Sequence, residues 1–530
     1  MPTLRKKSAS EASSKRGRSR SKSPGRAPSR SRSRGRSPGR PRKSPSRAKP
    51  AAKEEKPATP APRSRSRPNA QVVKTPSTPT RKPVAEVKTP TTPSRRSVRI
   101  ENQVQEEKPA AKLDSKAKPE PAQKAKCSMS DPILALLSIL IQPAILLYMN
   151  EACTKKSCDI KKVPALPKGV ASYINKESML AVLGFIAVQL ILALIPVGKL
   201  VEGRPLKGGK RLKYRCNGLL AFVVTLLAFA VAVYKNVPFN FFLTNLRQLI
   251  VSTTLLCLIL SVLLFIRARK LSASARAANS GNFIYDFYMG KELNPRIGSF
   301  DLKFFGLRLC YLGWAFVNGV FLASAYAKGP VNPALALAAA GQILYTFDFF
   351  LFEDSVLNGL DITSEGLGFM LLFCDLAWIP FLHTLSSRYL LMYPQNPSNC
   401  VLAAILFLNV IGYVIYRGSN NQKNKIIQNP HSPDLAHLET IPTSSGRKLL
   451  ISGWWGLCRH PNYLGDVLMI LSWACYCGTA SVIPYIYPVY FLFHMLYRQH
   501  WDDALCKQKY GAAWDRYCER VRYRLVPYIY

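Results

Sequence analysis

The chain has 530 residues, a formal net charge of +44 and a mean hydropathy of zero. That average conceals two regions, because residues 1–126 hold 36 Lys and Arg against 9 Asp and Glu, a net charge of +27, and the first aromatic residue is Tyr148. A region this polar cannot bury enough apolar surface to offset its chain entropy. The composition therefore excludes a single soluble globular domain and predicts a disordered basic N-terminal arm over residues 1–126.

The arm has a repetitive texture, with Arg and Ser alternating around residues 18–47 and Lys-Thr-Pro recurring at 74–76 and 88–90. A flexible chain of this charge binds polyanions, and counterion release makes that binding strongly salt-dependent. The lack of stacking aromatics argues against base recognition. DNA, RNA, an acidic protein surface and an anionic membrane leaflet are all candidate partners. The alternative is a solvated tail that only sets topology and nuclear import.

Phosphorylation of the arm would act on the same charge field. Each phosphate adds about −1.5 to −2 charge, so a run of such sites can cancel the basic field and switch polyanion binding. The Ser-Pro and Thr-Pro sites suit proline-directed kinases. The candidate sites lie beside Arg or before Pro: Ser23, Ser29, Ser31, Ser33, Ser37, Ser44, Thr75 and Thr89.

From residue 127 onward, apolar runs are long enough to cross a bilayer, and runs of this length do so as helices. Residues 127–530 are therefore predicted to form an all-α polytopic membrane domain with about ten transmembrane helices. No apolar stretch lies near Met1, so the first run is expected to be the targeting anchor. Because the arm and the tail at 498–524 are both basic, both ends are expected on the cytoplasmic or nucleoplasmic side. The predicted spans are 132–149, 178–200, 217–234, 247–266, 303–327, 333–352, 367–393, 400–416, 463–478 and 481–497.

The 13 cysteines show no spacing typical of zinc sites, so no metal centre is expected. Cys153 and Cys158 fall in the first loop after the first span, which this topology places in an oxidising lumen. Whether these two cysteines pair is left open by the sequence.

Charged residues within apolar spans are costly and usually functional. The densest polar and aromatic segment is GWWGLCRHPNYLGD at residues 453–466. By itself it fits two structures equally: a helix break that lines a ligand cavity, or a loop packed by its own aromatics. The acidic residues that stand out in or beside the spans are Asp286, Asp348, Glu353, Asp354, Asp361 and Asp375.

The segment at 453–466 resembles a signature of the sterol reductase family, which includes the delta-14 and delta-7 sterol reductases. The segment GNFIYDFYMG at 281–290, followed by Pro295 and Arg296, resembles the family's other signature, and the chain end from Lys509 to Tyr530 also matches. The resemblance covers residues from about 130 to 530. It implies NADPH as cofactor and hydride transfer to a carbocation that forms when an acid protonates a sterol double bond.

The resemblance also assigns residues to the site. It implies a proton-donor role for Tyr345 and a catalytic as well as a cofactor-binding role for Asp502. The positions that match cofactor contacts are Lys423, Leu450, Trp455, Asn462, Tyr463, Asp502, Cys506, Lys509, Tyr510 and Tyr517.

Several positions depart from the family pattern. Ile427 stands four residues after Lys423 where the family has Arg, and Trp501 replaces an Arg directly before Asp502. The stretch 306–310 reads GLRLC in place of Glu-Leu-Arg-Pro-Gly. Arg supplies a permanent charge and a fork of donors, so losing two such groups would weaken NADPH binding by several kcal/mol. Reductase activity is therefore expected to be weak or lost.

An Arg- and Ser-rich arm on such a core resembles the nuclear-envelope members of the family. That resemblance implies an inner nuclear membrane protein whose arm tethers the lamin network, DNA and chromatin, directly or through chromatin adaptor proteins. Nuclear import receptors, membrane lipid and sterol are the further expected partners. The alternative hypothesis is an active NADPH-dependent delta-14 sterol reductase with an unusual tail.

Overall fold

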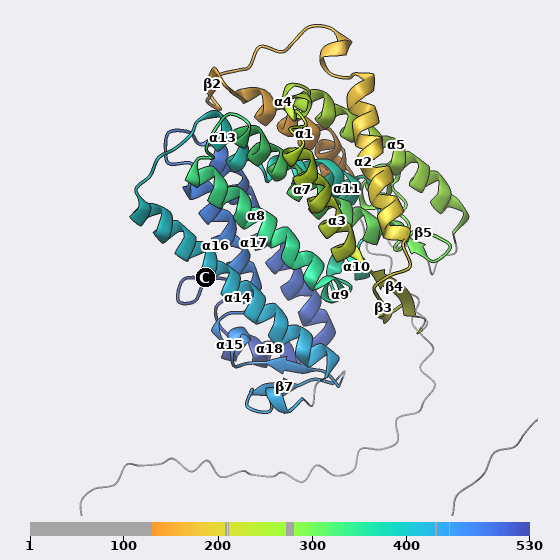
Figure 1. The fold of residues 1–530 in the computed structure, drawn as a ribbon. Helices are drawn as coiled ribbons and strands as arrows, with labels where there is room; N and C mark the ends of the chain where they lie inside the picture. The colour runs from red at the N-terminus through yellow and green to blue at the C-terminus, as the bar shows by residue number, and fades with distance from the viewer. Residues whose placement is uncertain (1–129, 207–208, 210, 272–279, 430–431, 445) are drawn as a thin grey trace, which may run out of the picture. The chain divides into compact units, whose positions relative to one another are not determined.

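The computed structural model describes residues 130–206, 209, 211–271, 280–429, 432–444 and 446–530. The predicted disordered arm and its phosphorylation candidates lie outside these residues. The described part is predominantly helical (Figure 1). Its longer helices are α1 (Ser130–Ala152), α2 (Lys176–Leu194), α3 (Gly218–Tyr234), α5 (Leu246–Arg267), α7 (Leu302–Tyr326), α8 (Pro333–Leu351), α14 (Asn399–Gln428), α16 (Pro461–Cys475) and α17 (Ile483–Tyr510).

Shorter helical segments connect or interrupt these helices. They are η1 (Val170–Ser172), α4 (Asn240–Thr244), η2 (Ala268–Lys270), α6 (Phe283–Met289), α9 (Glu353–Val356), α10 (Leu360–Thr363), α11 (Phe369–Phe373), η4 (Cys374–Trp378), α12 (Ile379–Leu382), α13 (Leu385–Met392), η5 (Pro433–Leu435), α15 (Trp454–Leu457) and α18 (Ala512–Arg520).

Each of the ten predicted spans coincides with a helix or a broken helix, which confirms the all-α polytopic class. Within the described residues, seven helices are long and apolar enough to cross a membrane by themselves. They are Asp131–Ala152, Val170–Leu194, Leu246–Lys270, Leu302–Tyr326, Pro333–Leu351, Phe369–Met392 and Asn399–Gln428. The other three predicted spans coincide with α3, with the 15-residue α16 and with the more polar α17.

The predicted span at 367–393 is not one regular helix but the series α11, η4, α12 and α13. Its η4 turn is π-helical, and Asp375 within it is buried. Pro380 follows at the start of α12, where its missing N–H removes a backbone hydrogen bond. π-Helical turns are frequent at functional sites.

In the part of the chain that the structure describes, four two-stranded antiparallel hairpins lie between helices, and the sequence analysis predicted none of them. In the longest, Val201 pairs with Tyr214 and Lys199 with Cys216. The hairpins are β1 (Cys153–Thr154) with β2 (Ser157–Cys158), β3 (Lys199–Pro205) with β4 (Arg211–Cys216), β5 (Arg296–Ile297) with β6 (Phe300–Asp301), and β7 (Thr440–Pro442) with β8 (Lys448–Leu450).

The β1–β2 hairpin is closed by a disulfide between Cys153 and Cys158, the pairing that the sequence left open. Tyr393 donates its hydroxyl hydrogen to the Thr154 carbonyl oxygen at 2.5 Å, and Ser481 donates to the Cys158 carbonyl oxygen at 2.8 Å. The hairpin therefore ties the C-terminal end of α1 to α13 and to the start of α17.

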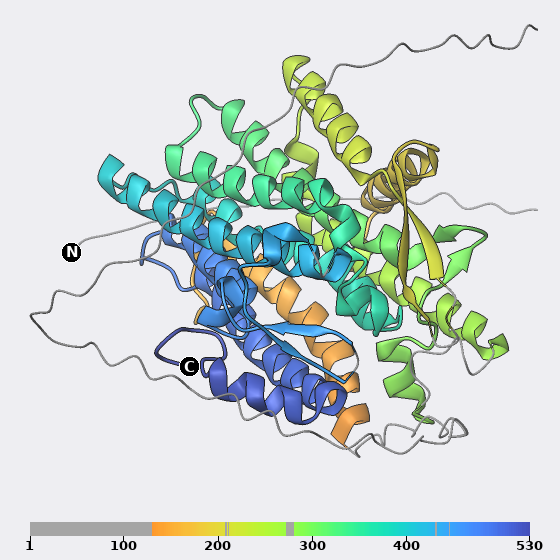
Figure 2. The ribbon, with the colours of Figure 1, turned by 90° about the horizontal axis from the view of Figure 1, so that it is seen from below.

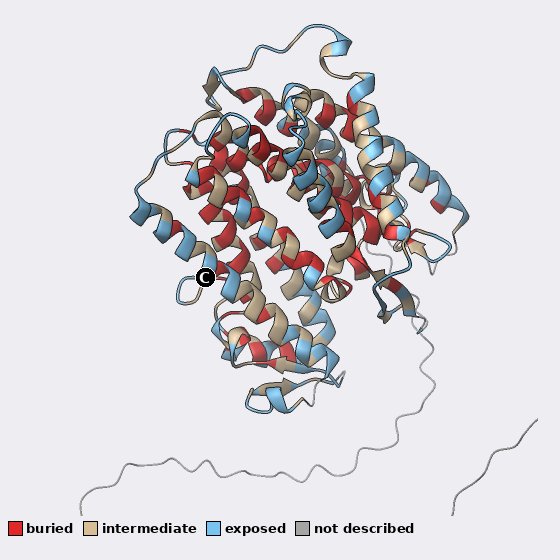
Figure 3. Cartoon of the chain, in the orientation of Figure 1, coloured by how far each residue is buried: buried red, intermediate tan, exposed pale blue. Residues whose placement is uncertain are grey.

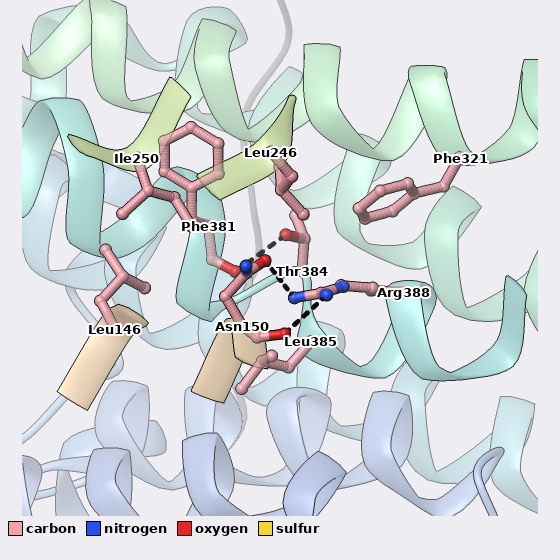
Figure 4. Close-up of a pocket in the computed structure, with 9 residues that line it drawn as sticks. All are labelled: Leu146, Asn150, Leu246, Ile250, Phe321, Phe381, Thr384, Leu385 and Arg388. Atoms are coloured by element: carbon pink, nitrogen blue, oxygen red, sulfur yellow. Dashed lines mark hydrogen bonds between the residues drawn. The ribbon is translucent and has the colours of Figure 1, made fainter. Parts of the chain in front are cut away.

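Arg388 of α13 reinforces this junction (Figure 4). Its guanidinium donates to Asn150 Oδ1 at 2.6 Å, to the Asn150 carbonyl at 2.8 Å and to the Cys153 carbonyl at 2.9 Å. Carbonyls at a helix C-terminus lack intrahelical donors, so this half-buried cation supplies them. A cavity of about 10 Å³, enough for one water molecule, lies beside it.

The buried residues concentrate in the middle of the helical body (Figure 3), and their largest cluster includes Phe369 and Phe373 of α11 and Leu382 of α12. The signature segment at 281–290 packs onto this region backbone to backbone. A Cβ added to Gly290, whose φ is +83°, would lie 2.3 Å from the backbone nitrogen of Gly368. Only glycine fits there, which gives this part of the signature an architectural reason.

Helices α14 and α16 also meet closely, because Gly412 and Gly465 face each other at the contact. A Cβ on Gly465 would lie 2.5 Å from the Tyr416 backbone nitrogen and 2.6 Å from the Gly412 carbonyl oxygen. Small residues allow membrane helices to approach in this way. The outer face of α14 exposes Phe407 and Val410, as expected for a lipid-facing helix.

Candidate cofactor site

Most residues of the candidate site come from the C-terminal half of α14, the start of α16 and the C-terminal half of α17, and the others come from α8, β8, α15 and α18. Figure 2 shows these helices side by side. Pro461 begins α16, where a missing N–H is tolerated, and Gly453 adopts a φ of +64° at the break before α15. The segment at 453–466 therefore contains a helix break before α16. That its residues line a ligand cavity stays a prediction.

Tyr463 and Asp502 form the closest polar pair, since the Tyr463 hydroxyl donates to Asp502 Oδ2 at 2.7 Å. His460 stacks on the Tyr463 ring, with centroids 4.9 Å apart. Beside them, Asn462 Oδ1 is buried and has no hydrogen-bond partner among the described residues. A buried unpaired acceptor is costly, so this amide oxygen points to a donor supplied by a ligand or water.

Lys423 and Trp455 form the next part of the site. The Lys423 ammonium lies 4.9 Å from the Trp455 ring centroid, a cation–π distance, while the lysine side chain remains exposed. Trp455 is fixed from behind, because its Nε1 donates to the Ser419 carbonyl at 3.0 Å and its own carbonyl accepts from Tyr517 at 3.5 Å. Leu450 is buried at the end of β8.

The last predicted cofactor residues lie at the junction of α17 and α18. Lys509 lies 4.8 Å from the Tyr510 ring, and Tyr517 packs with Trp514 at 4.8 Å between centroids. Cys506 packs against this aromatic cluster. Burial raises the pKa of the Cys506 thiol to about 11, so it is neutral near pH 7.

Tyr345 and Asp502 are not hydrogen-bonded to each other. Its hydroxyl donates to Asp466 Oδ1 at 3.1 Å, and its ring packs against Trp314 and Tyr416. The predicted catalytic pair is thus divided between two dyads, Tyr345 with Asp466 and Tyr463 with Asp502. Asp466 belongs to the signature segment but was not selected as a site residue.

Sequence reasoning also missed the cations that pair with the acidic residues it singled out. Arg417 pairs with Asp348, and Arg498 lies 3.4 Å from Asp361. The signal that would have found them was available, since an acid in an apolar helix needs a partner. What the sequence could not supply was which cation folds onto which acid.

A buried lysine fixes the loop that carries Glu365 and Asp361. Lys303 donates to the Ile362 carbonyl at 2.9 Å and to the Glu365 carbonyl at 2.7 Å. Burial, followed by the charge of Asp361, raises the pKa of Glu365 to about 7. This loop therefore contributes a carboxyl group that titrates near neutral pH.

Of the positions that depart from the family pattern, two lie on the surface and one is internal. Ile427 and Trp501 are on the surface, with 40% and 56% of their area exposed. Gly306 is internal, and a Cβ there would lie 3.1 Å from Asp375 Oδ2. Asp375 is buried, and its carboxylate thus lies beside a position without a side chain.

Part of the site fits a nicotinamide dinucleotide. Asn462 offers an unpaired buried acceptor, Tyr463 and Asp502 offer an ordered polar pair, and Lys423 offers an exposed cation for a phosphate group. Bound there, NADPH would supply a hydride. Among the described residues no cluster of His, Cys, Asp or Glu could hold a metal ion.

The fold defines a polytopic membrane protein whose candidate cofactor residues gather mainly on its C-terminal helices. Residues 129–530 match the model of the family described as "Ergosterol biosynthesis ERG4/ERG24 family". The chain belongs to this family of sterol reductases, which in general depend on NADPH.

Three relatives illustrate the likeness. The chain is 41% identical over 413 residues to mouse Delta(14)-sterol reductase TM7SF2, covering 77% of this chain and 99% of that protein. It is 41% identical over 387 residues to chicken Delta(14)-sterol reductase LBR, covering 72% of this chain and 61% of the relative. It is 36% identical over 390 residues to Delta(14)-sterol reductase erg24 of Schizosaccharomyces pombe, covering 71% and 91%.

Proposed function

We propose that the protein tethers the lamin network and chromatin to the inner nuclear membrane through residues 1–126, with its N-terminus in the nucleoplasm. The observation that carries this proposal is the joining of a +27 arm to a sterol reductase core. The arrangement resembles the lamin B receptor, and the chicken relative named LBR supports the comparison. Import receptors, DNA and chromatin adaptor proteins are the partners whose chemistry fits the arm.

The membrane domain, in this proposal, keeps the reductase fold and a cofactor-type pocket but has weak or no reductase activity. Support comes from α14, where Lys423 is followed one turn later by the uncharged Ile427. Residues four apart lie on the same helix face, so α14 provides one cation fewer for a cofactor phosphate than the family pattern does. The side-chain-free position at Gly306 removes a further polar group from beside Asp375.

An active NADPH-dependent delta-14 sterol reductase is the second candidate. It is favoured by the ordered Tyr463–Asp502 pair and by the 41% identity that extends over 99% of the mouse Delta(14)-sterol reductase. The two functions are compatible in one chain, because residues 1–126 and the membrane domain are separate along the sequence.

Complementation separates the candidates for the membrane domain. The full chain is expressed in cells that lack delta-14 sterol reductase, beside mouse Delta(14)-sterol reductase TM7SF2 as the positive control. We expect little or no reduced sterol by mass spectrometry. Full rescue that is lost in the Tyr463→Phe variant would overturn the weak-activity proposal and establish the second candidate.

Photobleaching tests the tether. Fluorescently tagged full-length chain is compared with residues 127–530 and with a full chain whose arm Lys and Arg are changed to Gln. We expect only the unmodified chain to concentrate at the nuclear rim with slow recovery. Equal distribution and equal recovery of all three would contradict tethering by the arm.

A further inference from the structure

A second cavity lies between helices of the N-terminal half of the membrane domain and shares no residue with the candidate cofactor site. Its volume is about 90 Å³, against about 10 Å³ for the cavity beside Arg388. Residues of α2, α4, α5, α7, η4 and α12 line it. Helix α2 contacts both α5 and α7 at this side of the helical body (Figure 1), so the cavity is a product of how separate spans pack.

The wall of this cavity is apolar. Of the described residues that line it, only Thr253 has a polar side chain, and its hydroxyl donates to the Leu249 carbonyl of the same helix at 2.8 Å. The wall therefore offers a ligand no free polar side chain. A buried water needs two to four polar partners, so this cavity favours hydrocarbon over water.

The cavity leads inward from an aromatic rim. Phe185 of α2, Phe242 of α4 and Phe316 of α7 are half-buried, and the ring centroid of Phe316 lies 5.3 Å from that of Phe185 and 5.2 Å from that of Phe242. Leu249 and Leu309 form part of the inner wall, where each is only 5% exposed. The space is thus accessible at the rim and enclosed at its inner end.

The rim faces the part of the surroundings that is expected to be lipid. The helices α2, α5 and α7 and the broken span at 369–392 are each long and apolar enough to cross a membrane. Near the rim, Leu183 and Val188 of α2 are 43% and 53% exposed. Apolar side chains on the outside of a spanning helix face lipid chains, so lipid chains are the molecules that reach this rim.

The volume of the cavity limits what can occupy it. An apolar cavity of about 150 Å³ holds one benzene ring, so 90 Å³ admits only part of a larger molecule. A rigid fused-ring skeleton is too wide, whereas a flexible aliphatic chain can insert its last few carbon atoms. Lipid chains are as apolar as the wall, so the gain comes from dispersion contacts that an empty cavity forfeits.

The inner wall of the cavity also belongs to the broken span. Leu309 packs in one apolar cluster with Leu376 of η4, which directly follows Asp375 in the π-helical turn. A Cβ added to Gly313 would lie 3.2 Å from Pro380 Cγ, so α7 lies directly against the start of α12. A molecule in the cavity would therefore contact the span where its regular helix is interrupted.

We propose that this cavity is a binding site for the end of a phospholipid acyl chain, which enters from the bilayer between the three phenyl rings of the rim. A phospholipid supplies flexible chain ends at membrane depth and leaves its polar headgroup at the surface. The cavity fits that chemistry, since its wall has no free polar side chain and its volume matches a chain end.

Photo-crosslinking of the full-length chain tests the site. The protein is reconstituted in phosphatidylcholine vesicles that contain a small fraction of phosphatidylcholine with a diazirine at the end of one acyl chain. After illumination, peptide mass spectrometry locates the label. We expect it on the inner-wall residues Leu249, Thr253 and Leu309 and on the exposed Phe407 of α14, which serves as the lipid-facing control. Labelling of Phe407 without labelling of the inner wall overturns the proposal.

Filling the cavity separates a specific site from general contact with lipid. Ala181→Phe places a ring in the cavity, and Ala187→Phe is the matched control because Ala187 is exposed on the same helix and does not line the cavity. We expect inner-wall labelling to fall at least fivefold in Ala181→Phe and less than twofold in Ala187→Phe, with Phe407 labelled equally in both. Val182→Phe, at a second lining position, should give the same loss. Unchanged inner-wall labelling in both lining variants overturns the site.

A sterol that carries the diazirine at the end of its side chain distinguishes the two sources of an aliphatic chain. We expect it to label the inner wall of the wild-type chain at no more than one fifth of the yield of the phospholipid probe. Equal or higher labelling by the sterol probe overturns the assignment to a phospholipid. The wild-type comparison holds whether or not the Phe variants fold.

Discussion

Restoring a cation at Ile427 tests whether the phosphate end of the pocket limits cofactor binding. Ile427 lies in the last turn of α14, four residues after Lys423, and 40% of its area is exposed. An arginine there would share a face with Lys423 and extend into solvent without displacing buried atoms. The Ile427→Arg variant therefore adds a donor fork where the family pattern has one, at no packing cost.

A hydrogen bond to a charged group contributes about 1.5–3 kcal/mol, which corresponds to about a 10- to 100-fold change in Kd. Because this position is partly exposed, solvent screening favours the lower end, about tenfold. Fluorescence titration of the purified chain with NADPH measures the effect. Gln428→Arg is the matched control, since it adds the same charge to the same helical turn but points about 100° away.

The gain should shrink as salt is raised, because the added interaction is between charges. An NADPH affinity of Ile427→Arg no higher than that of Gln428→Arg would refute the argument that a missing cation on α14 weakens the site.

Three further predictions concern the junction around the β1–β2 hairpin, the acidic loop and the arm. Arg388→Met leaves three buried acceptors unpaired, so it should lower the free energy of unfolding by about 3–6 kcal/mol in denaturation experiments, whereas the exposed Arg516→Met should not. The folded chain holds a proton on Glu365 that an unfolded chain releases above pH 4.5, so stability falls as pH rises from about 4.5 to 7. Glu365→Gln should reduce this loss of unfolding free energy by at most about 3 kcal/mol. Identical unfolding midpoints of the variant and the wild type at pH 5 and at pH 8 would contradict this prediction. Residues 1–126 should lose DNA affinity on the order of a thousandfold between 50 and 200 mM salt, and a salt-insensitive interaction would contradict the counterion argument.

The helical architecture could be predicted because bilayer-spanning length leaves few alternatives to a helix. The ten expected spans coincide with helical segments, but two features escaped prediction. The run at 367–393 is broken at η4 and α12, where Pro380 and the π-helical turn interrupt one apolar pattern. The β3–β4 hairpin was not predicted because its residues are polar and lie between two spans, where a loop without strands is the usual expectation.

Candidate site residues could be predicted where they belong to a sequence motif. They were missed where only the tertiary fold brings charged residues together. Asn462 and Tyr463 came from the signature, and the structure places Tyr463 against Asp502. Arg498 was missed because no local sequence pattern marks it, since its partner Asp361 lies far along the chain. Pairing of charges across distant elements is a property of packing that periodicity and composition do not encode.

The fixed residue Trp455 and the exposed residues Ile427 and Trp501 provide different evidence about activity. Trp455 is held by the Ser419 carbonyl and by Tyr517, so replacing it would disturb helix packing whether or not a cofactor binds. Such residues can persist for structural reasons alone. Ile427 and Trp501 are exposed, and a cation at either position would have little to interact with except a ligand or solvent. We therefore expect their lack of charge to lower cofactor affinity, and a fixed Trp455 is consistent with the proposal of weak reductase activity.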